Sequence, residues 1–212
     1  MNGCVIAMTL CVGMLLWCER RGFRAGVWVA KPLAALTFVT AGLAMGALDT
    51  AFGRVMLVGF FFCMGGDVLL IPRARGAFLA GLVSFLLGHV AYAVAFAVRG
   101  LDPGACAAAG TALALIGVLI AYWLLPRVEP RMKAPVVAYM VVITAMVALA
   151  AGTFAARGNP WLFAGAVGFY LSDLAVARDR FVAPGFSNRA WGLPLYFYSQ
   201  LALASTVASA AP

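Results

Sequence analysis

Eight apolar runs follow one another along this chain of 212 residues, and only short connections separate them. The runs lie at about 2–18, 33–48, 55–72, 77–98, 105–125, 134–155, 160–177 and 191–209. A helix that crosses a bilayer needs roughly 20 mostly apolar residues. The sequence therefore predicts an all-α, polytopic membrane bundle of about eight transmembrane helices, with residues 1–212 forming a single transmembrane helical domain.

The scarcity of charge excludes a soluble protein. Of the residues, 65% are hydrophobic and 10% are charged, and the mean hydropathy is +1.02. Ordinary globular domains are about 25% charged, and a soluble chain with so few charges would expose large apolar patches. The surface is therefore expected to face membrane lipids.

The basic residues are distributed unevenly between alternate loops. Twelve of the fifteen follow the first, third, fifth and seventh runs: Arg20, Arg21, Arg24, Lys31, Arg73, Arg75, Arg127, Arg131, Lys133, Arg178, Arg180 and Arg189. The positive-inside rule places these loops in the cytoplasm and both termini on the opposite side. Lipid phosphates account for the net charge of +8, so no nucleic-acid partner is expected. The composition, rich in Ala, Gly, Val and Arg, favours a bacterial inner membrane.

Two acidic residues, Asp67 and Asp173, lie inside apolar runs. An acidic side chain at the centre of a membrane helix costs roughly 2.5–3.5 kcal/mol. Both runs are expected to cross inward, and each aspartate stands five or six residues before an arginine of the following loop. The two carboxyl groups are therefore expected at matching depth, in one polar pocket of the cytoplasmic half.

Other polar residues fall on faces that can reach this pocket. His89, the one histidine of the chain, shares a helical face with Tyr92, and it can serve either as an interhelical hydrogen-bonding group or as a partner of the carboxyl groups. Tyr196 and Gln200 are four residues apart, hence on one face. Ser172 can hydrogen-bond a carboxyl group.

Neighbouring residues complete the expectation for these segments. Gly65 and Gly66 leave room for a neighbouring helix or a ligand beside Asp67. Trp191 and Pro194 are expected to open the last helix, with the proline in its first turn. Glu19 and Asp179 are expected to be solvated at helix ends.

Several kinds of site are disfavoured by the sequence. One histidine is too few for a usual catalytic zinc site, and the five cysteines show no metal or redox spacing. No phosphate-binding loop or dinucleotide fingerprint is present. We expect no cofactor and no metal, and no obligate protein partner is evident.

Two neighbouring carboxyl groups permit more than one function. One can act as general acid while the other acts as base, which suits hydrolysis of an acid-labile ether. The same pair suits a proton-coupled transporter, and a lipid-binding protein without hydrolytic activity is also possible. A purely structural bundle, with the aspartates paired to His89, is the third reading.

A set of short motifs resembles the YhhN/TMEM86 family of membrane proteins. It runs from the third apolar run to the eighth: Gly66-Asp67, Phe85-x-x-Gly88-His89-x-x-Tyr92, Ser172-Asp173 with Phe181 after it, and Tyr196-x-x-x-Gln200. Characterised members are lysoplasmalogenases, which hydrolyse the vinyl ether bond of a lysoplasmalogen to a fatty aldehyde and a glycerophospho-headgroup.

The resemblance implies an ether hydrolase of lipid metabolism with a single-chain ether lysophospholipid as substrate. We expect Asp67 and Asp173 to be the acid/base pair, without assigning either role. His89, Tyr92, Tyr196 and Gln200 are expected to orient the water and the ether oxygen, and Ser172 to assist in substrate binding. The headgroup would lie toward Arg73 and Arg178.

Overall fold

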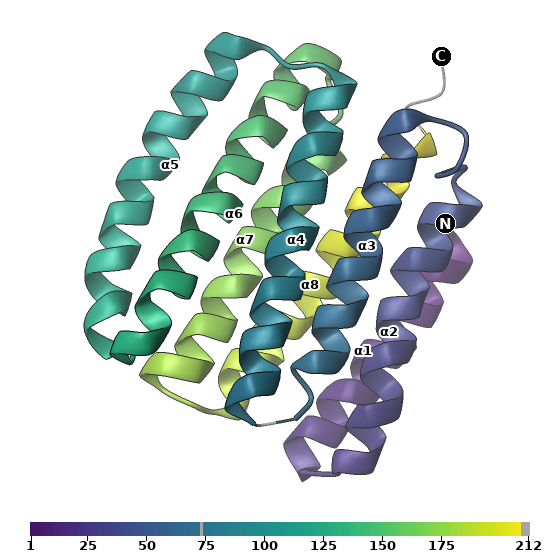
Figure 1. Cartoon of the computed structure of the whole chain (residues 1–212). Coiled ribbons are helices and arrows are strands. Elements are labelled where there is room, and N and C mark those ends of the chain that lie inside the picture. Colours follow the sequence, from purple (N-terminus) through teal and green to yellow (C-terminus); the bar gives the residue numbers. More distant parts are fainter. Residues whose placement is uncertain (73, 209–212) are drawn as a thin grey trace.

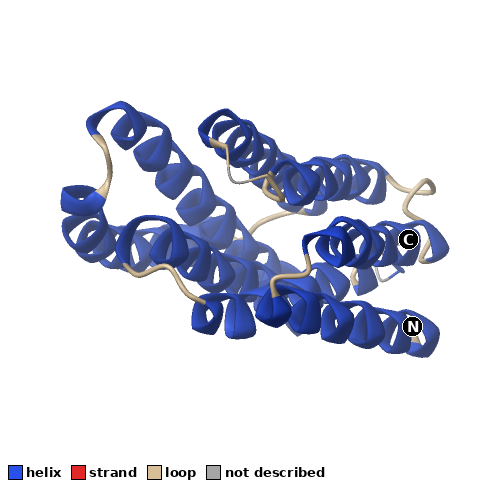
Figure 2. Cartoon of the chain, turned by 90° about the horizontal axis from the view of Figure 1, so that it is seen from below, coloured by secondary structure: helices blue, strands red, loops and turns tan. Residues whose placement is uncertain are grey.

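The computed structural model describes residues 1–72 and 74–208 and contains only helices and short loops in this part of the chain (Figures 1 and 2). The helices are α1 (Asn2–Arg21), α2 (Arg24–Ala44), α3 (Ala51–Leu69), α4 (Arg75–Arg99), α5 (Pro103–Leu124), α6 (Pro130–Arg157), α7 (Pro160–Ala177) and α8 (Phe186–Ser205). A short 3₁₀ turn, η1 (Leu125–Arg127), extends α5, and a π-helical turn, η2 (Arg178–Val182), extends α7.

Local signals in the sequence set several helix ends. Asp102 and Asn159 cap α5 and α7 by accepting backbone N–H groups, and a proline follows each cap at the first helical position. Gly22 and Gly158 end α1 and α6 in the left-handed conformation. These caps explain why the four helices begin or end at these residues.

Seven of the helices pack into a closed ring. Each helix of the ring contacts the next in the order α1, α2, α3, α4, α6, α7, α8, and α8 contacts α1 to close the ring. α8 also packs against α2, whereas α5 packs against α6 at the outer edge of the bundle (Figure 1). The side chains that point into this ring form the core and the site described below.

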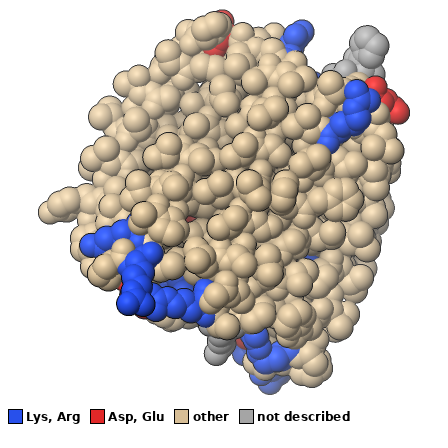
Figure 3. All heavy atoms as spheres, in the orientation of Figure 1, with Lys and Arg blue, Asp and Glu red and all other residues tan. Residues whose placement is uncertain are grey.

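Within the described residues, α1 to α7 are each long and apolar enough to cross a membrane. α8 is more polar and falls outside this group, so the predicted number of about eight spans is close. The Lys and Arg side chains gather toward one end of the bundle, called here the basic end, and a wide, mostly uncharged belt separates them from the other end (Figure 3). The protein is an all-α integral membrane protein, as predicted.

Two predicted helix starts are wrong. α2 begins at Arg24 rather than near 33, so Lys31 and Pro32 lie within the helix. α8 begins at Phe186, so Trp191 and Pro194 also lie within a helix and not at its first turn. Proline is tolerated inside membrane helices because neighbouring groups can satisfy the freed carbonyl. As a result, Lys31 lies on the buried face of α2 instead of in a cytoplasmic loop.

The close approach expected beside Asp67 is present between α3 and α4. A Cβ atom on Gly66 would come within 2.6 Å of the Phe85 ring. We therefore expect Gly66→Val to destabilise the bundle by about 1–3 kcal/mol, since overpacking forces neighbouring side chains to move. Thermal unfolding in detergent measures the effect, with Gly76→Val as control because a Cβ on Gly76 meets no atom within 4 Å. Equal unfolding temperatures for the two variants would contradict the tight contact.

Candidate functional site

A cavity of about 670 Å³ lies inside the helical ring and reaches toward the basic end. It is lined by residues from all eight helices, and both Asp67 and Asp173 contribute to its wall. The structure thus brings α3 and α7 together at one chamber, although the two aspartates are far apart in sequence. The volume falls in the range of about 300–1,000 Å³ that is typical of small-molecule pockets.

Asp67 lies in the last turn of α3 and is 1% exposed. Its Oδ1 is 3.3 Å from the Lys31 Nζ of α2. The Tyr196 hydroxyl of α8 donates a hydrogen bond of 2.7 Å to Oδ2. Both carboxyl oxygens are therefore occupied, one by a cation and one by a hydroxyl, and this explains how the group is accommodated in a membrane helix.

Asp173 has a different environment. The Tyr139 hydroxyl of α6 donates a hydrogen bond of 2.6 Å to Oδ2, and the His89 Nε2 atom of α4 is 3.5 Å from the same oxygen. The other ring nitrogen of His89, Nδ1, is 2.6 Å from the Phe85 carbonyl oxygen. Among the ion pairs of the described residues, Asp173 has no lysine or arginine partner. The two aspartates therefore share a cavity but differ in their partners.

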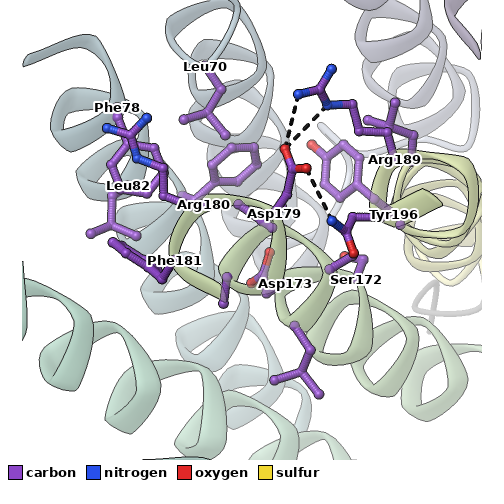
Figure 4. Close-up of a pocket in the computed structure, with 18 of the residues that line it drawn as sticks. Leu70, Phe78, Leu82, Ser172, Asp173, Asp179, Arg180, Phe181, Arg189 and Tyr196 are labelled. Atoms are coloured by element: carbon purple, nitrogen blue, oxygen red, sulfur yellow. Dashed lines mark hydrogen bonds and ion pairs between the residues drawn. The ribbon is translucent and has the colours of Figure 1, made fainter. Parts of the chain in front are cut away.

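The seven residues predicted for the site occupy two layers. Asp67, Ser172, Asp173 and Tyr196 line the cavity, and Figure 4 shows the last three there. His89, Tyr92 and Gln200 are fully buried behind its wall.

In that second layer, the Tyr92 hydroxyl donates a hydrogen bond of 2.6 Å to the side-chain oxygen Oε1 of Gln200. Ser172 does not bond a carboxyl group, since its hydroxyl donates to the Phe169 carbonyl one turn earlier in α7. Of the second layer, only His89 has a described polar contact with either aspartate.

Sequence reasoning missed two partners of the aspartates, Lys31 and Tyr139. In sequence, Lys31 and Pro32 stand directly before the apolar run 33–48, and a charge followed by a proline is typical of a loop. Tyr139 lies in the predicted span 134–155 and has no distinctive neighbours in sequence. A helical reading that starts at Arg24 would have made Lys31 the single charge within an apolar helix, which is a signal of function.

The mouth of the cavity at the basic end holds a network centred on Arg189. This side chain pairs with Glu19 at 2.8 Å and with Asp179 at 3.1 Å. Asp179 also accepts from the side-chain amide of Asn188 (Figure 4). The expectation that Glu19 and Asp179 are merely solvated is therefore wrong, because both line the cavity and hold its mouth together.

Two further cations line the mouth, Arg24 and Arg180. Arg24 donates to the Ile71 carbonyl, and the Arg180 guanidinium lies 4.4 Å from the centre of the Phe78 ring. Neither forms an ion pair with a described acidic residue. Of the arginines expected near a headgroup, Arg178 is bonded to the Asn188 side chain, and Arg73 lies outside the described residues.

One side of the cavity, next to α5 and α6, is apolar. Its wall there comes from α4, α5, α6 and η2: Phe78, Leu82, Ile120, Leu124, Val136, Met140, Ile143 and Phe181. This apolar arm reaches α5, the helix outside the ring. The cavity therefore combines a polar mouth, two carboxyl groups and an apolar arm, as an amphipathic single-chain molecule requires. In the described residues, no cluster of three or more His, Cys, Asp or Glu side chains could hold a metal ion.

Comparison with known proteins agrees with this arrangement. The chain is 31% identical over 164 residues to the human protein named lysoplasmalogenase TMEM86A, covering 74% of this chain and 67% of that one. It is 29% identical over 164 residues to the Bos taurus protein of the same name, with the same coverage. It is 33% identical over 150 residues to lysoplasmalogenase TMEM86B of Rattus norvegicus, covering 70% of this chain and 59% of that one.

No solved structure matches the chain. The model of the YhhN family matches residues 26–207, which include every residue of the cavity wall except Glu19 and Arg24. The chain therefore belongs to the YhhN family.

Proposed function

We propose that this protein is a membrane hydrolase that cleaves the vinyl ether bond of lysoplasmalogens. The observation that carries the proposal is the pair of carboxyl groups in the wall of one cavity large enough for a lipid. The similarity to proteins named lysoplasmalogenase supports it. The alkenyl chain would occupy the apolar arm, and the headgroup would remain at the basic end.

The reaction needs one acid and one base. One carboxylic acid gives its proton to the β-carbon of the vinyl ether, and the electron pair of the C=C bond forms the new C–H bond. Water attacks the α-carbon of the resulting oxocarbenium ion, and the second carboxylate accepts a proton from that water. General acid–base catalysis of this kind contributes typically 10²–10⁴-fold to a rate.

The hemiacetal formed in this way then breaks its C–O bond to the glycerol. The proton held by the second carboxyl group moves to the glycerol oxygen, while the hemiacetal hydroxyl returns a proton to the first carboxylate. The products are a fatty aldehyde and a glycerophospho-headgroup, and both carboxyl groups recover their starting states. The carboxylates also stabilise the positive charge of the intermediate, which is the larger part of catalysis in many sites.

The proposal is tested by incubating the purified protein with an sn-1 alkenyl lysophospholipid and measuring aldehyde release. The matched control is the alkyl ether lysophospholipid, which lacks the double bond and cannot be protonated in this way. Aldehyde from the alkenyl lipid alone is the expected result. Its absence, together with proton-driven flux in liposomes, would replace the proposal with a transporter.

The arginines of the mouth provide a second test. A hydrogen bond to a charged group contributes about 1.5–3 kcal/mol when buried, and a bond at this exposed position contributes less. Arg24→Gln or Arg180→Gln is therefore expected to raise KM for the lysophospholipid about three- to tenfold. The value of kcat should change little because neither residue forms an ion pair with Asp67 or Asp173. Arg21→Gln is the control, since Arg21 is exposed at the same end but does not line the cavity. A fall in kcat at unchanged KM would contradict headgroup binding there.

The orientation and location of the protein are also part of the proposal. The basic end would face the cytoplasm, with both termini on the other side, and the membrane would be a bacterial inner membrane. Cysteine labelling from outside intact cells, at residues introduced into the 46–50 and 127–129 loops, distinguishes the two orientations. Labelling of the second loop would contradict the proposed one.

A further inference from the structure

The two aspartates of the cavity differ in the charge placed beside them. The Lys31 Nζ atom is 3.3 Å from Asp67, and this lysine is 8% exposed. A buried ammonium group is costly unless a negative group is paired with it. Because Asp67 is the one acidic partner of Lys31 among the described ion pairs, the most stable state of this pair is an ammonium and a carboxylate.

Asp173 faces a different kind of group. A backbone carbonyl can only accept a hydrogen bond, so the contact of 2.6 Å between the Phe85 carbonyl and the His89 Nδ1 atom places a hydrogen on that nitrogen. In a neutral imidazole the other nitrogen, Nε2, is then an acceptor. This buried Nε2 has no hydrogen-bond partner, and the Asp173 Oδ2 atom lies 3.5 Å from it.

The His89 ring is fully buried, and the Asp173 side chain is 17% exposed. Two acceptors facing each other at such a site are unfavourable unless a proton lies between them. A neutral His89 therefore fits a protonated Asp173, and an ionised Asp173 fits a protonated His89. Each arrangement places one proton on the Asp173–His89 pair. Among the described residues, the titratable groups in direct polar contact with the two carboxyl groups are Lys31 from α2, His89 from α4, Tyr139 from α6 and Tyr196 from α8. The buried Cys63 of α3 and Tyr92 of α4 lie close enough to interact electrostatically with them.

We propose that Lys31 is a positioning residue that keeps Asp67 as the carboxylate base, so that the proton used in the reaction is stored on Asp173 and His89. The assignment of catalytic roles rests on the proposed function, whereas the assignment of protons does not. In the reaction, Asp173 then protonates the β-carbon of the vinyl ether, and Asp67 takes the proton from the attacking water. Without Lys31, both carboxyl groups would compete for protons and the division of roles would be lost.

Infrared spectroscopy of the purified protein tests the proton assignment without any substrate. Near neutral pH, the carbonyl band of a protonated carboxyl group should be unaffected by Asp67→Asn in the wild-type background. Lys31→Met should create an additional band of this kind, and that band should vanish in the double variant Lys31→Met/Asp67→Asn. Lys31→Arg keeps the charge and should create none. A protonated Asp67 in the wild type, or no change in Lys31→Met, overturns the proposal.

The lone histidine locates the stored proton. Nitrogen-15 labelling of histidine gives signals from His89 alone, and these signals separate a neutral ring with Nδ1 protonated from an imidazolium ring. A neutral ring supports the proposal when the infrared band of a protonated Asp173 is present. An imidazolium ring supports it when that band is absent. A neutral ring combined with an ionised Asp173 overturns it.

Kinetics then connect this assignment to catalysis. Lys31→Met is expected to lower kcat about 100-fold with less than a threefold change in KM, and Lys31→Arg to restore most of the loss. Lys133→Met is the matched control, because Lys133 is the other lysine of the chain and is exposed. Should Lys31→Met not fold, Lys31→Gln takes its place. If the wild type shows no turnover, the proposed function fails, while the spectra still decide the proton assignment.

Discussion

Replacing Asp173 with asparagine is expected to lower kcat for an alkenyl lysophospholipid by about 10²–10⁴-fold, the usual contribution of a general acid. An amide cannot deliver a proton to the β-carbon. The other described carboxyl groups of the cavity cannot replace it, because Asp67 is paired with Lys31, and Glu19 and Asp179 are paired with Arg189. The Tyr139 hydroxyl, now 2.6 Å from Asp173, can still donate to the amide oxygen. Folding should therefore be preserved, and thermal unfolding in detergent verifies this.

Asp49→Asn is the control for Asp173→Asn. Asp49 is exposed in the loop between α2 and α3 and does not line the cavity, so kcat should remain unchanged. A value of kcat for Asp173→Asn within threefold of the wild type would remove Asp173 from the reaction. It would leave Asp67 as the one candidate carboxyl group and would contradict the two-carboxylate mechanism.

Replacing Asp67 with asparagine is expected to affect stability as well as activity. Removal of one partner from a buried ion pair costs about 3–5 kcal/mol, because it leaves the other charge unpaired. The lower end of that range is expected here, since Lys31 lines the cavity and retains 8% of its exposure. The measurement is the free energy of unfolding in detergent, compared with that of Asp173→Asn, which leaves no buried lysine or arginine without its partner.

The double variant Lys31→Met/Asp67→Asn provides the control for this prediction. It removes both charges together, so most of the lost stability should return, while activity should remain low. Two residues that interact in this way give non-additive changes in free energy. Additive losses in the double variant would mean that the contact of 3.3 Å between Lys31 and Asp67 contributes little to stability.

The sequence predicted the helical bundle and the position of Asp67 and Asp173 at one polar pocket. An acidic side chain in an apolar run is costly unless it reaches such a shared polar site. It did not predict Lys31 or Tyr139 as their partners. A lysine followed by a proline is typical of a loop, and only packing of α2 beside α3 shows that the helix continues through both. A tyrosine such as Tyr139, in the middle of an apolar helix, carries no periodic signal that identifies its contact.

The position of His89, Tyr92 and Gln200 could not be predicted for a related reason. Helical periodicity identifies the face of a helix that points inward, but it does not say whether that face reaches a cavity or only a neighbouring helix. The Phe169 ring of α7 contacts the rings of His89, Tyr92 and Tyr196. His89 and Tyr92 therefore pack behind the cavity wall, and Gln200 lies beside Tyr92. The structure separates the residues that can touch a ligand from those that support them.

The place of α5 outside the ring bears on how the two products would leave. The apolar arm includes Ile120 and Leu124 of this peripheral helix, while Arg24 and Arg189 line the polar opening. A fatty aldehyde could pass beside α5 straight into the bilayer, and the water-soluble fragment could depart through the polar opening. Separate exits for the apolar aldehyde and the water-soluble fragment would keep both products from occupying the cavity when the next substrate binds.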